Sequence, residues 1–94
     1  MKKYIPYVYF VCNRTTGLKY IGVEYGKTAK VANPKNLFTE YFTSSSAVKK
    51  LIDLYGKEDF YIKILHTFPN DPESAILMES KYFPLIKKRT DYLN

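Results

Sequence analysis

Two short tyrosine-containing triplets near the start of the chain are the residues best suited to chemistry. Tyr7-Val8-Tyr9 and Tyr20-Ile21-Gly22 flank a turn-forming segment, residues 13–17, and ten residues separate Tyr9 from Tyr20. This pattern predicts one β-hairpin that places Tyr9 and Tyr20 across from each other at similar height. Two interpretations stay open from the residues alone. The phenols either pack in the core or handle a proton as a pair.

A carboxylate in the last predicted helix is the second candidate. At about 100° per residue, Glu79 falls in the middle of an apolar arc. A carboxylate that faces a small core is costly unless it is paired or binds a cation. The pattern leaves two interpretations equally open: an ion pair with a lysine or a shallower helix end, and a ligand for a divalent metal. The arc comprises Ala75, Ile76, Met78, Tyr82 and Phe83.

Hydrophobic periodicity and turn residues predict the elements that position these side chains. We expect strands over residues 3–12, 18–23 and 60–68, with Tyr7, Tyr9 and Val11 on one face of the first strand. Val8, Phe10 and Cys12 share the other face. A short helix is expected over residues 35–41, and a longer one over 47–55, capped by a serine of 44–46 and by Gly56. The last helix should begin at Pro72 and run to about Phe83, where Pro84 ends or kinks it.

Composition bounds the possible functions. The 94 residues, 46% of them apolar, suffice for one small domain over residues 1–94, and no stretch is long enough for a membrane span. Cys12 is the sole cysteine and His66 the sole histidine, which excludes an internal disulfide and a His/Cys metal cluster, and fits a reducing cytosol. A net charge of +6 with a pI near 9.4 suits a phosphate-backbone partner, although only two of the 15 basic residues are arginines.

These motifs together resemble the GIY-YIG nucleases. Tyr20-Ile21-Gly22 matches the second family triplet fully, whereas Tyr7-Val8-Tyr9 matches the first in its last two positions. Glu79 occupies the place of the family's metal-binding glutamate, and Asn94 follows 15 residues later, as in some members. The middle of the chain resembles a phage branch with homing-endonuclease-like members. The positions that carry this resemblance are Tyr41-Phe42-Thr43-Ser44-Ser45, Tyr55-Gly56 and Phe60.

The resemblance implies an α/β fold, a small three-stranded, mostly antiparallel sheet flanked by helices. It implies a metal-dependent DNA endonuclease in which Tyr9 accepts a proton from water, Tyr20 positions water or phosphate, and Glu79 holds Mg²⁺ or Mn²⁺. The expected partner is double-stranded DNA, with neither a membrane nor a small-molecule cofactor involved, in the cytoplasm of a host cell if the chain is phage-encoded. The expected DNA-binding residues are Tyr7, Lys27, Lys30 and Asn94.

One departure from the family pattern concerns Glu24. The family places an arginine after the second triplet, where it contacts the scissile phosphate, and this chain has no arginine between Gly22 and Thr43. Glu24 would repel the phosphate that a guanidinium should bind. Three explanations stay open: natural loss of activity, a cation relocated to Lys27 or Lys30, and an engineered silencing substitution. Two other functions are therefore kept, an inactive nuclease-derived DNA-binding module and a tyrosine-rich interaction domain.

Overall fold

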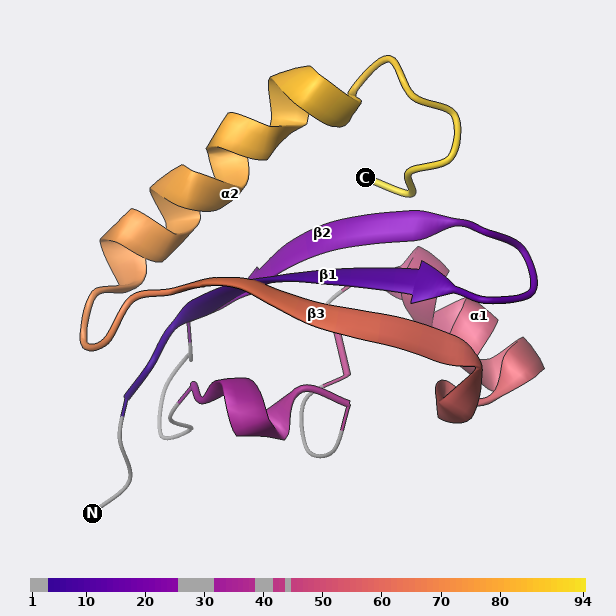
Figure 1. Ribbon diagram of the computed structural model, residues 1–94, viewed down its shortest axis with the longest axis horizontal. Helices are drawn as coiled ribbons and strands as arrows, with labels where there is room; N and C mark the ends of the chain where they lie inside the picture. The colour runs from indigo at the N-terminus through magenta and orange to yellow at the C-terminus, as the bar shows by residue number, and fades with distance from the viewer. Residues whose placement is uncertain (1–3, 26–31, 39–41, 44) are drawn as a thin grey trace.

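The computed structural model describes residues 4–25, 32–38, 42–43 and 45–94 (Figure 1). Lys27, Lys30 and Tyr41, which the sequence analysis singled out, lie outside these residues. Across the described part of the chain, no helix has the length and apolar character needed to cross a bilayer.

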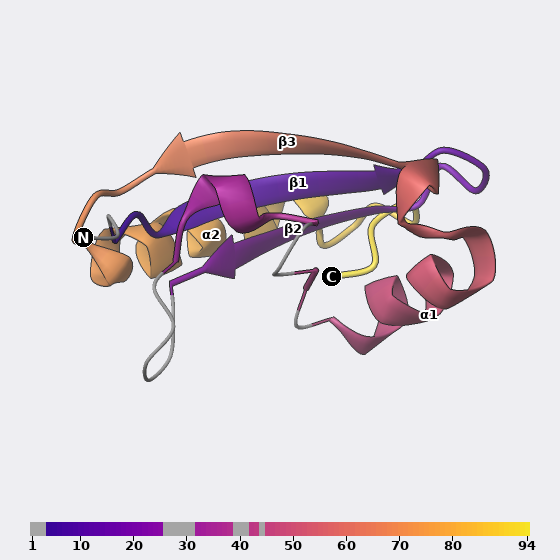
Figure 2. The same cartoon turned by 90° about the horizontal axis from the view of Figure 1, so that it is seen from below.

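A three-stranded antiparallel sheet with the order β2-β1-β3 forms the centre of the molecule, which confirms the predicted α/β class. Helices α1 and α2 pack on opposite faces of this sheet (Figures 1 and 2). The strands are β1 (Tyr7–Asn13), β2 (Lys19–Glu24) and β3 (Phe60–Thr67). The helices are α1 (Ser46–Tyr55) and α2 (Pro72–Ile86), with 3₁₀ turns η1 (Pro34–Asn36) and η2 (Lys57–Asp59).

The central strand β1 divides the interior into two cores, because successive side chains of a strand point to opposite faces. Tyr7, Tyr9 and Val11 are buried on one face, hereafter the tyrosine face, against α1 and the segment around η1. Val8 and Phe10 lie on the other face, hereafter the α2 face, where α2 covers them. The predicted alternation of these five residues is therefore confirmed.

The predicted strand boundaries need small corrections. The first strand begins at Tyr7 rather than at residue 3, since Pro6 has no amide hydrogen to donate to a neighbouring strand. The carbonyl of Pro6 still accepts a hydrogen bond from the Phe68 amide at 2.8 Å. The second strand is shifted by one residue to Lys19–Glu24, and the third ends at Thr67.

The segment before α1 differs from the expected helix over residues 35–41. Its described part is a single 3₁₀ turn, Pro34–Asn36, capped by Asn33, whose side chain accepts a hydrogen bond from the Lys35 amide. Phe38 then adopts a φ of 58°, a left-handed conformation that ends the turn. Asn33 and Pro34 look like helix-breaking residues in the sequence. In the structure Asn33 caps the 3₁₀ turn, and Pro34 is its first residue.

Helix α1 begins and ends as predicted. The Ser45 side chain accepts a hydrogen bond from the Val48 amide at 3.3 Å, which caps the helix start. Gly56, with a φ of 82°, terminates the helix in a conformation that side chains rarely adopt. Val48 is buried against the tyrosine face, and Leu51 and Ile52 pack beside it.

Helix α2 continues past Pro84 to Ile86, so the predicted end at Phe83 is wrong. Pro84 lacks the N–H that would reach the preceding turn, which in a helix interior costs about 3 kcal/mol. Here the proline stands in the final turn, where the Lys87 amide still donates to the Phe83 carbonyl at 2.9 Å. Burial of Ile86 on the α2 face favours this last turn.

A candidate nuclease site at the β2 edge

The tyrosines predicted to act together share the tyrosine face and contact one another. The ring centroids of Tyr7 and Tyr9 are 6.0 Å apart, and those of Tyr9 and Tyr20 are 6.2 Å apart. The prediction that Tyr9 and Tyr20 lie directly across the hairpin from each other is wrong. The register partner of Tyr9 is Gly22, and Tyr20 pairs with Val11. The two phenols are therefore diagonal neighbours, which is still within the reach of aromatic side chains.

Gly22 makes this diagonal contact possible. A Cβ atom at position 22 would lie 2.5 Å from Tyr9 Cζ and 2.7 Å from Tyr20 Cε2, distances that real Cβ atoms do not tolerate. The glycine of the second triplet is thus a steric requirement for two rings to pack over the same strand.

Gly22→Ala should therefore destabilise the protein by about 1–3 kcal/mol, because both rings must move to admit the methyl group. The measurement is urea-induced unfolding of the parent and the variant. In a Tyr9→Phe background the loss should shrink, since the hydroxyl nearest the new methyl group is gone. An unchanged unfolding midpoint for Gly22→Ala would contradict the ring packing described here.

Thr43 holds the hydroxyl of Tyr9, a contact that the sequence analysis missed. Tyr9 Oη lies 3.1 Å from Thr43 Oγ1, and Thr43 Oγ1 also accepts a hydrogen bond from the Ser45 amide at 3.1 Å. Both side chains are buried. The only available signal was the position of Thr43 directly before the hydroxyl residues that cap α1. The start of α1 is consequently tied to the central strand.

Glu24 is brought to the same face as the tyrosines. It ends β2 and pairs in register with Tyr7, so its side chain leaves the sheet on the tyrosine face and is partly exposed. The register therefore places Glu24 beside the tyrosine cluster. Lys27 and Lys30, the expected substitute cations, lie outside the described residues.

Glu79 lies on α2, which covers the opposite face of the sheet (Figure 1). The buried stripe of α2 runs through Ala75 and Ile86, whereas Ile76 and Phe83 are 43% and 41% exposed. The predicted arc was therefore centred too far round the helix, and Glu79 flanks the buried stripe instead of occupying its middle. This difference arises because Ile76 and Phe83, which the predicted arc includes, are exposed.

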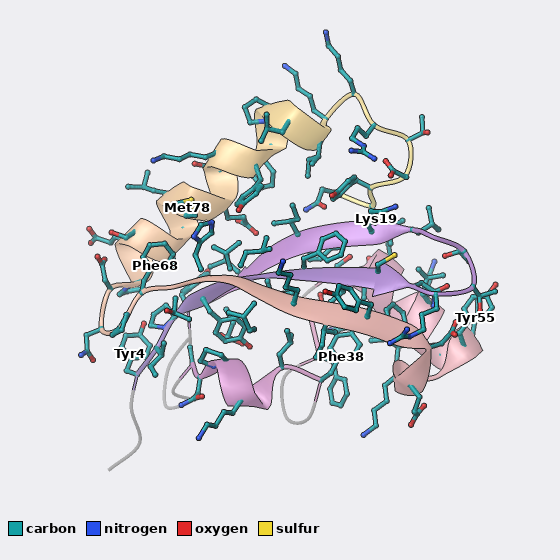
Figure 3. The ribbon with its side chains drawn as sticks, viewed as in Figure 1. Tyr4, Lys19, Phe38, Tyr55, Phe68 and Met78 are labelled. Carbon is teal, nitrogen blue, oxygen red and sulfur yellow. The ribbon has the colours of Figure 1, made fainter. Side chains whose placement is uncertain are left out.

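The packing of α2 identifies the side toward which Glu79 is turned. Tyr82 Oη lies 2.8 Å from Nε2 of His66 on β3, and Met78 packs in the same cluster as Phe68 just beyond β3 (Figure 3). Met78 and Glu79 lie on opposite flanks of the buried stripe at helical spacing. Glu79 consequently lies on the flank of α2 away from β3, on the β2 side.

The Glu79 carboxylate is half-buried and has no cationic partner among the residues that the structure describes. Burial raises the pKa of this carboxyl, and no charge among the described residues offsets that effect. Neither an ion pair nor a hydrogen bond reaches the Glu79 carboxylate from any residue in the described ranges, so the ion-pair interpretation finds no support there. The described residues also contain no cluster of three metal-ligating side chains. A lone carboxylate fits Mg²⁺, which keeps several waters and takes its other ligands from phosphate.

Asn94 lies at the outer edge of β2, between the two faces. Its Oδ1 accepts a hydrogen bond from the Ile21 amide at 3.0 Å, and its Nδ2 donates to the Ile21 carbonyl at 2.6 Å. Ile21 belongs to the second triplet and points to the α2 face, while Tyr20 points to the tyrosine face. Asn94 is thus held at the edge of β2, beside the second triplet, whose side chains alternate between the two faces.

Comparison with known proteins places the chain in a family context. A family model described as "Putative endonuclease segE, GIY-YIG domain" matches residues 1–88. Searches of curated proteins and of solved structures gave no match.

Proposed function

Because the chain belongs to the GIY-YIG endonuclease family, we propose that it hydrolyses phosphodiester bonds of duplex DNA with a divalent metal, Mg²⁺ or Mn²⁺. The observation that carries this proposal is the carboxylate of Glu79, which is half-buried without a compensating cation among the described residues. Phage origin and a homing role remain predictions.

Three side chains have separate roles in the proposed reaction. Tyr9, in its phenolate form, accepts the proton of the attacking water, and partly exposed Tyr20 positions that water or the phosphate. Tyr9 is fully buried in the free chain and engaged with Thr43, so its hydroxyl must become accessible when DNA binds. A metal held by Glu79 would supply electrostatic stabilisation of the leaving oxygen. Tyr7 lies two residues before Tyr9 on the same face of β1, and its ring packs against the ring of Tyr9 and supports it.

Glu24 is the reason to keep an alternative, an inactive DNA-binding module. It places a negative charge on the tyrosine face, where the transition state would gather negative charge on phosphoryl oxygens. The discriminating test is nicking of supercoiled plasmid, with and without Mg²⁺, by the chain as given and by a variant with a cation at position 24. Cleavage by neither protein, together with salt-sensitive duplex binding, would favour the inactive module.

Duplex binding should be weak, insensitive to sequence and electrostatic, because the net charge of +6 is carried almost wholly by lysines. Lysines act as point charges and read no base edges bidentately. If about three to five phosphates are neutralised, the logarithm of the binding constant should fall with the logarithm of salt concentration with a slope of roughly −3 to −5.

Fluorescence anisotropy with two unrelated duplexes of equal length would measure this dependence. Single-stranded DNA of the same length, added as a competitor, is the control for duplex preference. Affinity that is independent of salt, or a strong preference for one of the two duplexes, would contradict the electrostatic account.

A further inference from the structure

We propose that residues 89–94, which lie beyond the family-matched region, form a strap that holds the outer edge of β2 and thereby fixes the position of Tyr20. The inference that Tyr20 must be fixed for catalysis rests on the proposed function. The inference that the strap fixes it rests on the structure alone, and the two can be tested separately.

The backbone of the strap completes an otherwise open sheet edge. β2 is an edge strand with β1 on one side only, and an open edge presents unpaired amides and carbonyls. The Lys19 amide donates to the Asp91 carbonyl at 2.8 Å, and the Leu93 amide donates to the Lys19 carbonyl at 2.7 Å. These bonds form a parallel bridge between Lys19 and Tyr92.

Asn94 extends the pairing by two residues with its side chain instead of its backbone. Its amide engages both the N–H and the carbonyl of Ile21, as described above. Each outward-facing backbone group of Lys19 and Ile21 therefore has a partner in the strap. Tyr20 stands between these two residues and pairs with Val11 of β1 on the inner side.

The side chains of the strap lie on both sides of the β2 edge and pack in both cores. Tyr92 packs on the α2 face, with its ring centroid 6.5 Å from that of Phe10. Leu93 packs on the tyrosine face, in the same cluster as Tyr20. Consecutive residues thus contact opposite faces of the sheet, which is the alternation of a strand. The strap restrains β2 through packing as well as hydrogen bonds.

An ion triad anchors the start of the strap to the hairpin. Arg89 binds Asp91 with two hydrogen bonds, of 3.0 and 2.7 Å, and Lys19 Nζ reaches Asp91 Oδ2 at 3.1 Å. Lys19 Nζ also donates to the Gly17 carbonyl at 2.9 Å, within the hairpin turn. The hydrogen bonds from Arg89 and Lys19 lower the pKa of Asp91 to about 2.

Asn94→Ala is the sharpest test of the strap, because it removes two hydrogen bonds and leaves the β2 sequence intact. The Ile21 amide should exchange its hydrogen at least about tenfold faster than in the parent, since its partner is lost. Tyr20 should also lose nuclear Overhauser contacts to Tyr9. Leu77→Ala, an exposed change on α2, is the matched control and should alter neither quantity.

Two results would overturn the proposal. One is unchanged exchange at Ile21, which would show that Asn94 does not hold the edge. The other is faster exchange with intact contacts between Tyr20 and Tyr9, which would show that the edge does not position the ring. Both measurements use the free protein, so they decide the proposal even if the chain has no nuclease activity.

Plasmid cleavage is the functional measurement. It is made either in the chain as given or in the Glu24→Arg variant, whichever of the two cleaves. Asn94→Ala should lower kcat about tenfold with little change in KM, because a misplaced Tyr20 affects the transition state rather than DNA binding. A rise in KM with unchanged kcat would instead assign Asn94 to DNA contact, the role predicted from the sequence, and would overturn the positioning role.

Discussion

Glu24→Arg is expected to turn the chain into a protein that nicks supercoiled plasmid in Mg²⁺. The register places residue 24 on the tyrosine face, beside Tyr7, where a guanidinium could bind a phosphate bidentately. Loss of one well-placed donor typically costs on the order of a hundred- to a thousandfold in rate, and the carboxylate adds repulsion to that loss. The gain on substitution should therefore exceed about a hundredfold.

Two further variants at this position separate charge removal from restored binding. Glu24→Gln keeps the size of the side chain and removes its charge, so it should recover only a small part of the activity, and Glu24→Ala should recover a similarly small part. All four proteins are compared on plasmid at equal concentration, with circular dichroism to confirm folding. Robust cleavage by the chain as given, or none by a folded arginine variant, would mean that the phosphate-binding cation lies elsewhere.

Glu79→Ala should abolish divalent-metal binding while the fold stays intact. The carboxylate is half-buried without a compensating charge from the described residues, so its removal also takes away a desolvation cost and should not lower stability. Isothermal titration with Mn²⁺ measures the binding. Glu73→Ala, which removes an exposed carboxylate from the first turn of the same helix, is the control and should bind like the parent.

The same assignment predicts the pH dependence of metal binding. Burial raises the pKa of the Glu79 carboxyl, so the metal must compete with a proton at higher pH than at an exposed glutamate. Affinity should be fully present above that raised pKa and should fall as the pH decreases through it. Equal Mn²⁺ affinity for Glu79→Ala and the parent would show that the metal binds elsewhere.

Short-range patterns predicted most of the fold. Alternation along β1 identified the two faces correctly, because period-2 burial leaves little freedom of register. Serine before an apolar helical repeat and glycine after it located α1. The same local rules failed at Pro84, because burial of Ile86 favours a turn that proline alone would disfavour.

Contacts between residues far apart in sequence limited the prediction of the site. The hydrogen bonds from Asn94 to Ile21 and from Tyr9 to Thr43 depend on the folded topology, and no periodicity encodes them. The diagonal placement of Tyr9 and Tyr20 depends on the hairpin register. The turn residues did not determine that register, so Tyr9 pairs with Gly22 and not with Tyr20. The position of Glu79 relative to the buried stripe of α2 was located only approximately, because Ile76 and Phe83 belong to the apolar pattern but are exposed in the fold.

The measurement that tests the central claim most directly is plasmid nicking by Glu24→Arg and by Glu24→Arg combined with Glu79→Gln, each with Mg²⁺ and with excess chelator. Glutamine preserves the shape of the side chain and removes the negative charge that holds the metal. The account predicts nicked circles only for the single variant in Mg²⁺, with the combined variant at least about a hundredfold slower. Equal cleavage by both variants in Mg²⁺, or cleavage by the single variant in chelator, would contradict a metal-dependent nuclease built on Glu79.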